Sequence, residues 1–280
     1  MSMSILNNIP SLAAQNQLAM TGANLQRTLF RLSSGSRINS GADDAAGLAI
    51  ADGLRANISA LTQSARNAND GVGKLQVADG ALAQVTTLLN RAVTLATESS
   101  TGTVSDAQRG ALDAEFIAIK AEIDRIGSNT NYNGAAVFSA TASDVYLSDS
   151  TATGSSTVSV TTGALGAATL NHGAKSVDLS ADDLTSATTA QTALTDINQA
   201  IANVAGTRGD LGAGINRLQS AVNVINNQTQ NLTSAEDSIR AADISQEVAN
   251  MTKFNILNQT GIAALAQANQ MQQSVLTLLR

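Results

Sequence analysis

Few side chains in this sequence could perform acid–base, nucleophilic or metal chemistry, and they lie far apart. His172 is the only histidine and cysteine is absent, so a catalytic triad or a metal site built on His172 would lack partners. We interpret His172 as a solvated loop residue. Asp43 and Asp44 are adjacent, and adjacent residues of a helix do not face each other, so we expect them to start a helix rather than to share a proton. The sequence predicts no catalytic residue, no metal site and no cofactor, and hence no enzyme.

A glycine-rich stretch from Gly206 to Gly214 could suggest a loop that binds phosphate. Its glycines lie within a regular apolar repeat, however, and no strand pattern precedes them, whereas a phosphate loop joins a strand to a helix. Phosphate binding is therefore not expected. These glycines either let another part of the chain approach closely or mark a local bend, and the sequence leaves both alternatives open.

The composition favours slender helices over a thick globular core. Hydrophobic residues make up 43% of the 280 residues but aromatic residues only 2%, and Pro10 is the only proline, so little prevents long helices. The formal net charge of −6 argues against a nucleic-acid partner, because phosphate binding requires a basic surface. The uncharged stretch Phe254–Leu279 contains eight Asn and Gln side chains, too many for insertion into a membrane.

Both ends of the chain are uncharged but patterned like amphipathic helices. No Lys, Arg, Asp or Glu occurs in residues 1–26 or 254–279. Apolar side chains recur there at steps of three, four and seven residues, which place them on one side of a helix. Because chain ends usually fray in solvent, we predict that these sides are polymerisation surfaces covered by further copies of the chain. The predicted residues are Ile9, Leu12, Leu18, Leu25, Leu29, Leu32, Val248, Met251, Leu257, Leu265, Val275 and Leu278.

Helical patterns fill most of the chain between these ends. Capping residues and apolar periodicity predict the helix boundaries. We expect helices over about 5–33, from Asp43 or Asp44 to Ser99, from Ser105 as a cap to Gly127, from about residue 191 onward, and from Asp243 to the C-terminus.

The segment from Ser139 to Ala190 has a different character. It is rich in Ser and Thr, and short alternating runs at 145–147, 157–160 and 176–179 predict brief strands. A low-complexity linker is the alternative. We favour a small β-rich insertion that faces solvent.

The predicted fold is mainly α: a long antiparallel helical bundle or coiled-coil rod with a small β-rich central insertion. The two helical halves must pair antiparallel, which places both termini together. The expected parts are an N-terminal assembly helix with its connecting loop at 1–42, the N-terminal part of the rod at 43–138, the surface-exposed insertion at 139–190, the C-terminal part of the rod at 191–233 and a C-terminal assembly helix at 234–280.

Two long motifs at opposite ends of the chain resemble those of a known family. Residues 32–50 read LSSGSRINSGADDAAGLAI, which is similar to the N-terminal signature of bacterial flagellin. Residues 256–270 and 275–280 read ILNQTGIAALAQANQ and VLTLLR, which resemble its C-terminal signature. The resemblance covers about 1–138 and 190–280. Gln272 is a departure, since flagellins commonly carry proline at this position.

This resemblance implies a subunit of the flagellar filament, the helical propeller for swimming, with the end helices in its inner core. It also implies export of the unfolded chain by the flagellar type III apparatus to an extracellular location, without a cleaved signal peptide. The implied partners are further copies of the chain in a helical homopolymer, a flagellin export chaperone, the filament cap protein and the hook–filament junction proteins. A hook–filament junction protein and a secreted surface adhesin are the alternative functions.

By the same resemblance, Arg91, Leu95 and Glu115 correspond to the patch that the Toll-like receptor for flagellin recognises. Val93 and Thr94 are departures, because strongly recognised members of the family carry a basic and an acidic residue there. We expect the patch to pack against neighbouring copies in a filament, and its recognition by the receptor is a further hypothesis.

Overall fold

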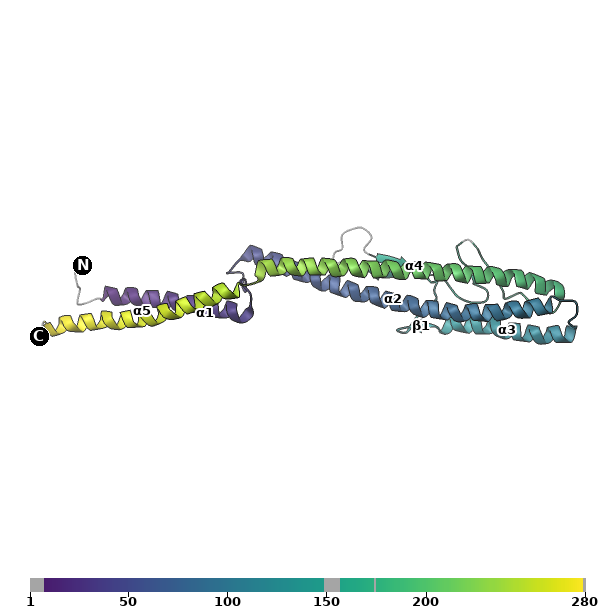
Figure 1. Cartoon of the computed structure of the whole chain (residues 1–280), viewed down its shortest axis with the longest axis horizontal. Helices are drawn as coiled ribbons and strands as arrows, with labels where there is room; N and C mark the ends of the chain where they lie inside the picture. The colour runs from purple at the N-terminus through teal and green to yellow at the C-terminus, as the bar shows by residue number, and fades with distance from the viewer. Residues whose placement is uncertain (1–7, 149–156, 174, 279–280) are drawn as a thin grey trace. The chain divides into compact units, whose positions relative to one another are not determined.

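The computed structural model describes residues 8–148, 157–173 and 175–278, apart from the side chains of 272, 273 and 275–278 (Figure 1). Within these residues the chain is mainly α-helical, as predicted. Its elements are α1 (Ile9–Ser34), α2 (Ala45–Ser99), α3 (Asp106–Asn129), β1 (Asn131–Tyr132), β2 (Ala135–Ala136), β3 (Ser143–Tyr146), β4 (Thr157–Val160), α4 (Ala187–Arg240) and α5 (Ile244–Leu278). They form two compact units, one from residues 1–56 and 231–280 and the other from residues 57–230.

In the first unit, α1 and α5 lie side by side and antiparallel (Figure 1). At one end, Asn8 Nδ2 donates to the Ala268 carbonyl (3.2 Å), and Ser11 Oγ donates to Asn269 Oδ1 (3.1 Å). Asn8 Oδ1 also accepts from the Ser11 amide and so caps the start of α1. Pro10 stands in the first turn, where its missing N–H costs no helical hydrogen bond.

The loop between α1 and α2 is held by local hydrogen bonds. Gly35 ends α1 with φ of 70°, a left-handed conformation in which glycine has no steric penalty. Asp43 Oδ2 accepts from the Asn39 and Ser40 amides, and Asp44 Oδ1 accepts from the Gly47 amide (2.9 Å). Asp44 thus bonds to the first turn of α2, as predicted for a residue at a helix start, whereas Asp43 bonds to the loop before it. The end of α4 lies against this loop, since Ser36 forms an antiparallel bridge with Ala241.

The second unit has one apolar core. Buried residues from α2, α3, α4 and the connecting segments form a continuous cluster. Leu82, Leu89, Phe116, Ile123, Ile197 and Leu211 are among its fully buried side chains. The apolar seams that the sequence shows in residues 54–96, 112–126 and 194–225 supply most of this core, because each seam lies on one side of its helix.

Helix α3 begins as predicted and ends later than predicted. Gln108 Oε1 accepts from the Ser105 amide (2.9 Å) and hydroxyl (3.0 Å) at its start. The prediction that Gly127 ends the helix is wrong, because α3 continues to Asn129. Gly127 is needed for packing instead: a Cβ there would lie 1.9 Å from the Leu165 carbonyl oxygen.

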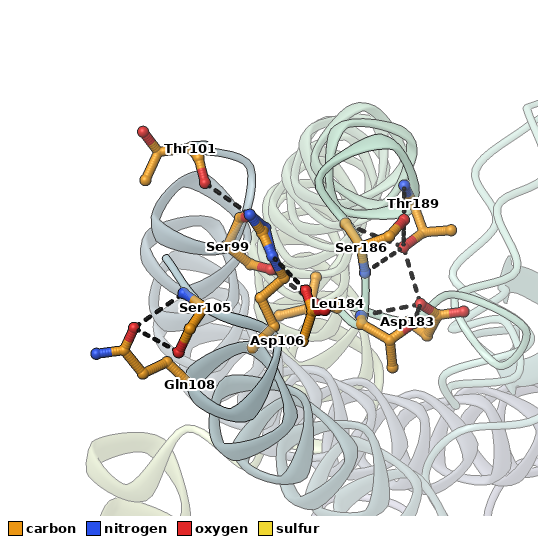
Figure 2. Close-up of polar contacts among 11 residues, drawn as sticks. Ser99, Thr101, Ser105, Asp106, Gln108, Asp183, Leu184, Ser186 and Thr189 are labelled. Atoms are coloured by element: carbon orange, nitrogen blue, oxygen red, sulfur yellow. Dashed lines mark hydrogen bonds and ion pairs between the residues drawn. The ribbon is translucent and has the colours of Figure 1, made fainter. Parts of the chain in front are cut away.

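Hydrogen bonds at one end of the second unit join α2, α3 and the segment before α4 (Figure 2). Ser99 Oγ donates to the Leu184 carbonyl (2.6 Å). The buried Arg109 donates to the carbonyl of Ser99, the last residue of α2, and to the carbonyl of Thr101 in the turn that follows. Ser186 and Thr189 exchange hydrogen bonds between side chain and amide, which caps α4.

The predicted insertion is partly correct. Strands β3 and β4 pair antiparallel, with Ser143 opposite Val160 and Tyr146 opposite Thr157, so the runs at 145–147 and 157–160 do contain strands. The predicted strand at 176–179 is wrong. That run has no strand partner, because its amides bond to loop acceptors: Val177 N donates to Asn171 Oδ1 and Leu179 N to the Ala167 carbonyl.

The insertion also contributes to the core. Val160, Leu170, Val177, Leu179 and Leu184 are buried with the helical seams. The prediction of a solvent-facing insertion is therefore wrong for these residues. In residues 176–179, buried and exposed side chains alternate as they do in a strand with one buried side. The segment is nevertheless a loop that packs against the core.

Candidate assembly interface

Between α1 and α5 runs a narrow seam of half-buried side chains. Leu18, Leu25 and Leu32 of α1 are half-buried there, as are Met251 and Leu265 of α5. The helices approach closely at one glycine, since a Cβ on Gly261 would lie 3.2 Å from Leu18 Cδ1. Small polar side chains interrupt the apolar seam on α1, where Ser11, Thr21 and Thr28 are the buried residues. Such a seam buries little apolar area, so it stabilises the pair only weakly.

An ion pair closes the other end of this seam. Arg31 Nη1 lies 3.5 Å from Glu247 Oε1, and Arg31 Nη2 lies 3.5 Å from Asp43 Oδ1. Arg31 thus joins α1, α5 and the loop before α2. Hydrogen bonds from the Asn39 amide, together with those from Ser40 and the charge of Arg31, lower the pKa of Asp43 from its ordinary value. Asp43 therefore stays ionised beside Arg31 at neutral pH.

The predicted polymerisation residues fall into two groups. Leu18, Leu25, Leu32, Met251 and Leu265 contribute to the seam. Five others point outward and are exposed: Ile9 (66%), Leu12, Leu29, Val248 and Leu257. The side chains of Val275 and Leu278 lie outside the described residues.

Sequence reasoning missed a further set of outward apolar side chains in this unit. The sequence predicted one apolar stripe on each helix, and apolar residues outside that stripe were not assigned a role. These residues are exposed in the structure: Met20 and Phe30 on α1, and Ile244, Ile256 and Ile262 on α5. Met271, which the apolar periodicity places in the stripe of α5, is exposed as well. Their signal in the sequence was the scarcity of charge in both helices, which carry only Arg27, Arg31, Glu247 and Lys253.

The helix pair thus presents apolar residues both in its seam and on its outer surface. One copy of the chain covers only the seam. A contiguous exposed apolar surface on a helix usually marks a site of association with another protein or a membrane. In the part of the chain that the structure describes, none of the helices combines the length and hydropathy required to cross a bilayer.

Two of the three predicted receptor-patch residues form an ion pair, and the third is inaccessible. Arg91 Nε lies 2.7 Å from Glu115 Oε1, and Arg91 Nη2 donates to Glu115 Oε2 at 2.9 Å. The hydrogen bonds to Arg91 lower the pKa of Glu115 from its ordinary value. Leu95 is only 1% exposed, because it points into the core of the second unit. Of the three predicted residues, Arg91 and Glu115 are therefore the accessible ones, and recognition by a receptor stays a prediction.

His172 lies in a loop with 35% of its side chain exposed, and it also has a partner that the sequence did not indicate. Its Nε2 lies 3.0 Å from Asp210 Oδ2, and its ring lies against α4, where a Cβ on Gly206 would be 2.7 Å from Nδ1. Gly206 thus permits close approach, one of the two alternatives left open by the sequence. Across the described residues, no cluster of His, Asp and Glu is arranged to hold a metal ion.

Comparison with known proteins links this helix pair to a family. The family model described as "Bacterial flagellin N-terminal helical region" matches residues 5–143 of the chain. A second model, "Bacterial flagellin C-terminal helical region", matches residues 194–279. Both helices of the pair lie almost wholly within these matches.

Relatives match the chain over nearly its whole length. Flagellin of Halalkalibacterium halodurans is 38% identical over 99% of this chain and 100% of its own length. The flagellar filament 33 kDa core protein of Treponema phagedenis is 35% identical over 99% of this chain and 100% of its own length. The crystal structure of Bacillus cereus flagellin aligns with 61% of this chain and 94% of its own, at 28% identity and a TM-score of 0.48. From the family matches and the full-length relatives, the chain belongs to the bacterial flagellin family, whose members are structural proteins of the flagellar filament and not enzymes.

Proposed function

We propose that the outward sides of α1 and α5 are the surfaces through which this flagellin polymerises into a filament for swimming. The observation that carries the proposal is the exposure of large apolar side chains on a helix pair whose own seam is narrow. Ile9, Leu12 and Leu29 of α1 and Val248 and Leu257 of α5 are the predicted residues on these surfaces. Identical head-to-tail contacts between copies produce an open helical polymer when the rotation from one copy to the next does not close into a ring.

The same weakness of the single helix pair suits export of an unfolded chain. A seam that buries little apolar area leaves α1 and α5 close to the limit of stability, so packing against further copies would supply much of their order. The chain also has no cysteine and hence no disulfide to break. We therefore propose export by the flagellar type III apparatus, with a chaperone on the C-terminal helix, a cap protein at the growing end and hook–filament junction proteins at the base.

Relatives that span the whole chain support a filament subunit over the alternatives of a junction protein or an adhesin. Relatives that match nearly the whole chain carry the names flagellin and flagellar filament core protein. The buried insertion residues favour the same conclusion, because a segment that forms part of the core has less surface to offer as an adhesive module.

Polymerisation of two matched variants tests the proposal. The first replaces Ile9, Leu12 and Leu29 by Ser, which are exposed apolar residues of α1. The control replaces Val77, Ile117 and Val224 by Ser, which are exposed apolar residues of the other unit. Sedimentation and electron microscopy would give the critical concentration of each. Burial of one such side chain contributes about 1.5–3 kcal/mol, so the loss of three should raise the concentration needed for polymerisation at least about a hundredfold, with a much smaller change in the control.

Equal effects in the two variants would contradict an interface centred on α1. So would unchanged polymerisation of the first variant. Circular dichroism of both variants before assembly would show whether either substitution had unfolded the 57–230 unit.

A further inference from the structure

All methionines of this chain lie in one of its two units. The sequence has five, Met1, Met3, Met20, Met251 and Met271, and all belong to the segments 1–56 and 231–280. The unit of residues 57–230 has none, although its core contains many Leu, Ile, Val and Ala side chains. Methionine is flexible and polarisable, and it suits apolar surfaces that must adapt to a partner.

Met20 and Met271 are on the outer surface of the helix pair. Met20 is 62% exposed and Met271 is 57% exposed. Met20 is about three turns from Ile9, which places both on the same side of α1. Met251 differs, because it is half-buried in the seam between α1 and α5. Exposure governs how readily a thioether is oxidised, so the two outer methionines should react before Met251.

We propose that oxidation of Met20 and Met271, two separate exposed positions on the helix pair, controls whether the subunit can polymerise. This inference rests on the proposed function, in which their surroundings become buried between copies. The oxidant is a peroxide. In hydrogen peroxide the O–O bond breaks, one oxygen forms a bond to the sulfur of methionine, and its proton passes to the other oxygen, which leaves as water. The sulfur loses two electrons in becoming a sulfoxide, and the peroxide gains them.

The physical effect follows from polarity. A thioether is apolar and can be covered by a partner without loss, whereas a sulfoxide oxygen is a hydrogen-bond acceptor that is costly to bury without a donor. The oxidised subunit should therefore join a polymer less readily. In a finished filament the same covering excludes peroxide, so oxidation acts on subunits before they assemble.

The test uses the purified full-length chain, with dilute hydrogen peroxide as the oxidant. Peptide mass spectrometry gives the extent of oxidation at each methionine, and seeded polymerisation gives the critical concentration. We expect Met20 and Met271 to be oxidised first, and the critical concentration to rise at least about tenfold once both are converted. Reduction by methionine sulfoxide reductases A and B should restore it. Treatment of preformed filaments should leave both residues largely unoxidised.

Two variants locate the effect. The double variant Met20→Leu with Met271→Leu keeps Met1, Met3 and Met251, and it should polymerise equally well before and after peroxide. The single variant Met251→Leu should remain sensitive. Leucine has a similar volume to methionine, so both variants should fold. Continued sensitivity of the double variant, or normal polymerisation of fully oxidised wild-type chain, would overturn this inference alone. Failure of untreated wild-type chain to polymerise would overturn the proposed function and this inference with it.

Discussion

Gly110 and Gly127 are both on α3 but have different surroundings. Space around a Cβ on Gly110 is open for at least 4 Å, while a Cβ on Gly127 would overlap the Leu165 carbonyl oxygen. We predict that Gly110→Ala raises the free energy of unfolding by up to about 1 kcal/mol, because alanine favours a helix more than glycine does. Gly127→Ala should lower it by about 1–3 kcal/mol, because the loop of Leu165 must move. Urea unfolding followed by circular dichroism measures both, and a stabilising effect of Gly127→Ala would disprove the close packing.

Asp182 and Asp183 are neighbours whose carboxyl groups respond to folding in opposite ways. Burial and the nearby carboxylate of Asp196 raise the pKa of Asp182, and its Oδ2 is buried without a hydrogen-bond partner among the described residues. Hydrogen bonds from Thr185, and a further one from the Thr189 hydroxyl, lower the pKa of Asp183. An ionised Asp182 therefore destabilises the fold at neutral pH, whereas an ionised Asp183 stabilises it.

We predict that Asp182→Asn raises the free energy of unfolding at pH 7 and that Asp183→Asn lowers it. For Asp182 the difference from wild type should fade as the pH falls through its raised pKa, because the wild-type carboxyl is then protonated. For Asp183 the difference should persist down to about pH 4, the ordinary value for Asp, and fade below it as the pH passes the lowered folded pKa. Urea titrations at several pH values measure both, and changes of the same sign at pH 7 would refute the assignment.

Single residues were predictable from sequence where their partners are close along the chain. The caps at Asp44 and Ser105 bond to amides or side chains three residues away, so a local pattern identifies them. The contacts of Gly127 and His172 were missed because their partners, Leu165 and Asp210, are 38 residues away in sequence. No periodicity in one segment reveals what a distant segment will place against it.

The element that could be predicted best is the helix with a regular apolar seam. Helices α1 to α5 were all expected, since their periodicity runs over many turns. The sequence did not separate the residues of the α1–α5 seam from the exposed ones, because the side chains that face the partner helix and those that face outward are both apolar. The loop at 176–179 was misread because alternating burial does not distinguish a strand from an extended loop that covers a core.

The Arg31–Glu247 ion pair is the contact between α1 and α5 that a single substitution tests best. Glu247 is buried, so Arg31→Met would leave its carboxylate without this cation. We predict that local opening of α5 becomes easier by about 1 kcal/mol, which faster amide hydrogen exchange near Glu247 would report. Arg27→Met is the matched control, since Arg27 is exposed one turn earlier on α1. Equal acceleration in both variants would argue against a specific contact.

At the scale of the whole chain, the two units differ in how much apolar surface each buries. The 57–230 unit has a continuous core with many fully buried side chains, whereas the α1–α5 pair has a half-buried seam. We predict that amides of α1 and α5 in the unassembled chain exchange with solvent much faster than amides near Leu89 and Leu211. Hydrogen-exchange mass spectrometry measures this. In filaments the two helices should become protected, and equal protection in the free chain would contradict assembly-coupled order.

Charge is nearly absent from the helix pair that we propose joins the copies. Helices α1 and α5 together carry four charged side chains, Arg27, Arg31, Glu247 and Lys253, and Arg31 and Glu247 pair with each other. Contacts made by apolar and amide groups are barely affected by screening from dissolved ions. The contacts between copies should therefore be equally strong at low and at high ionic strength. Cooling weakens apolar association, so it should weaken these contacts more than a reduction of the salt concentration does.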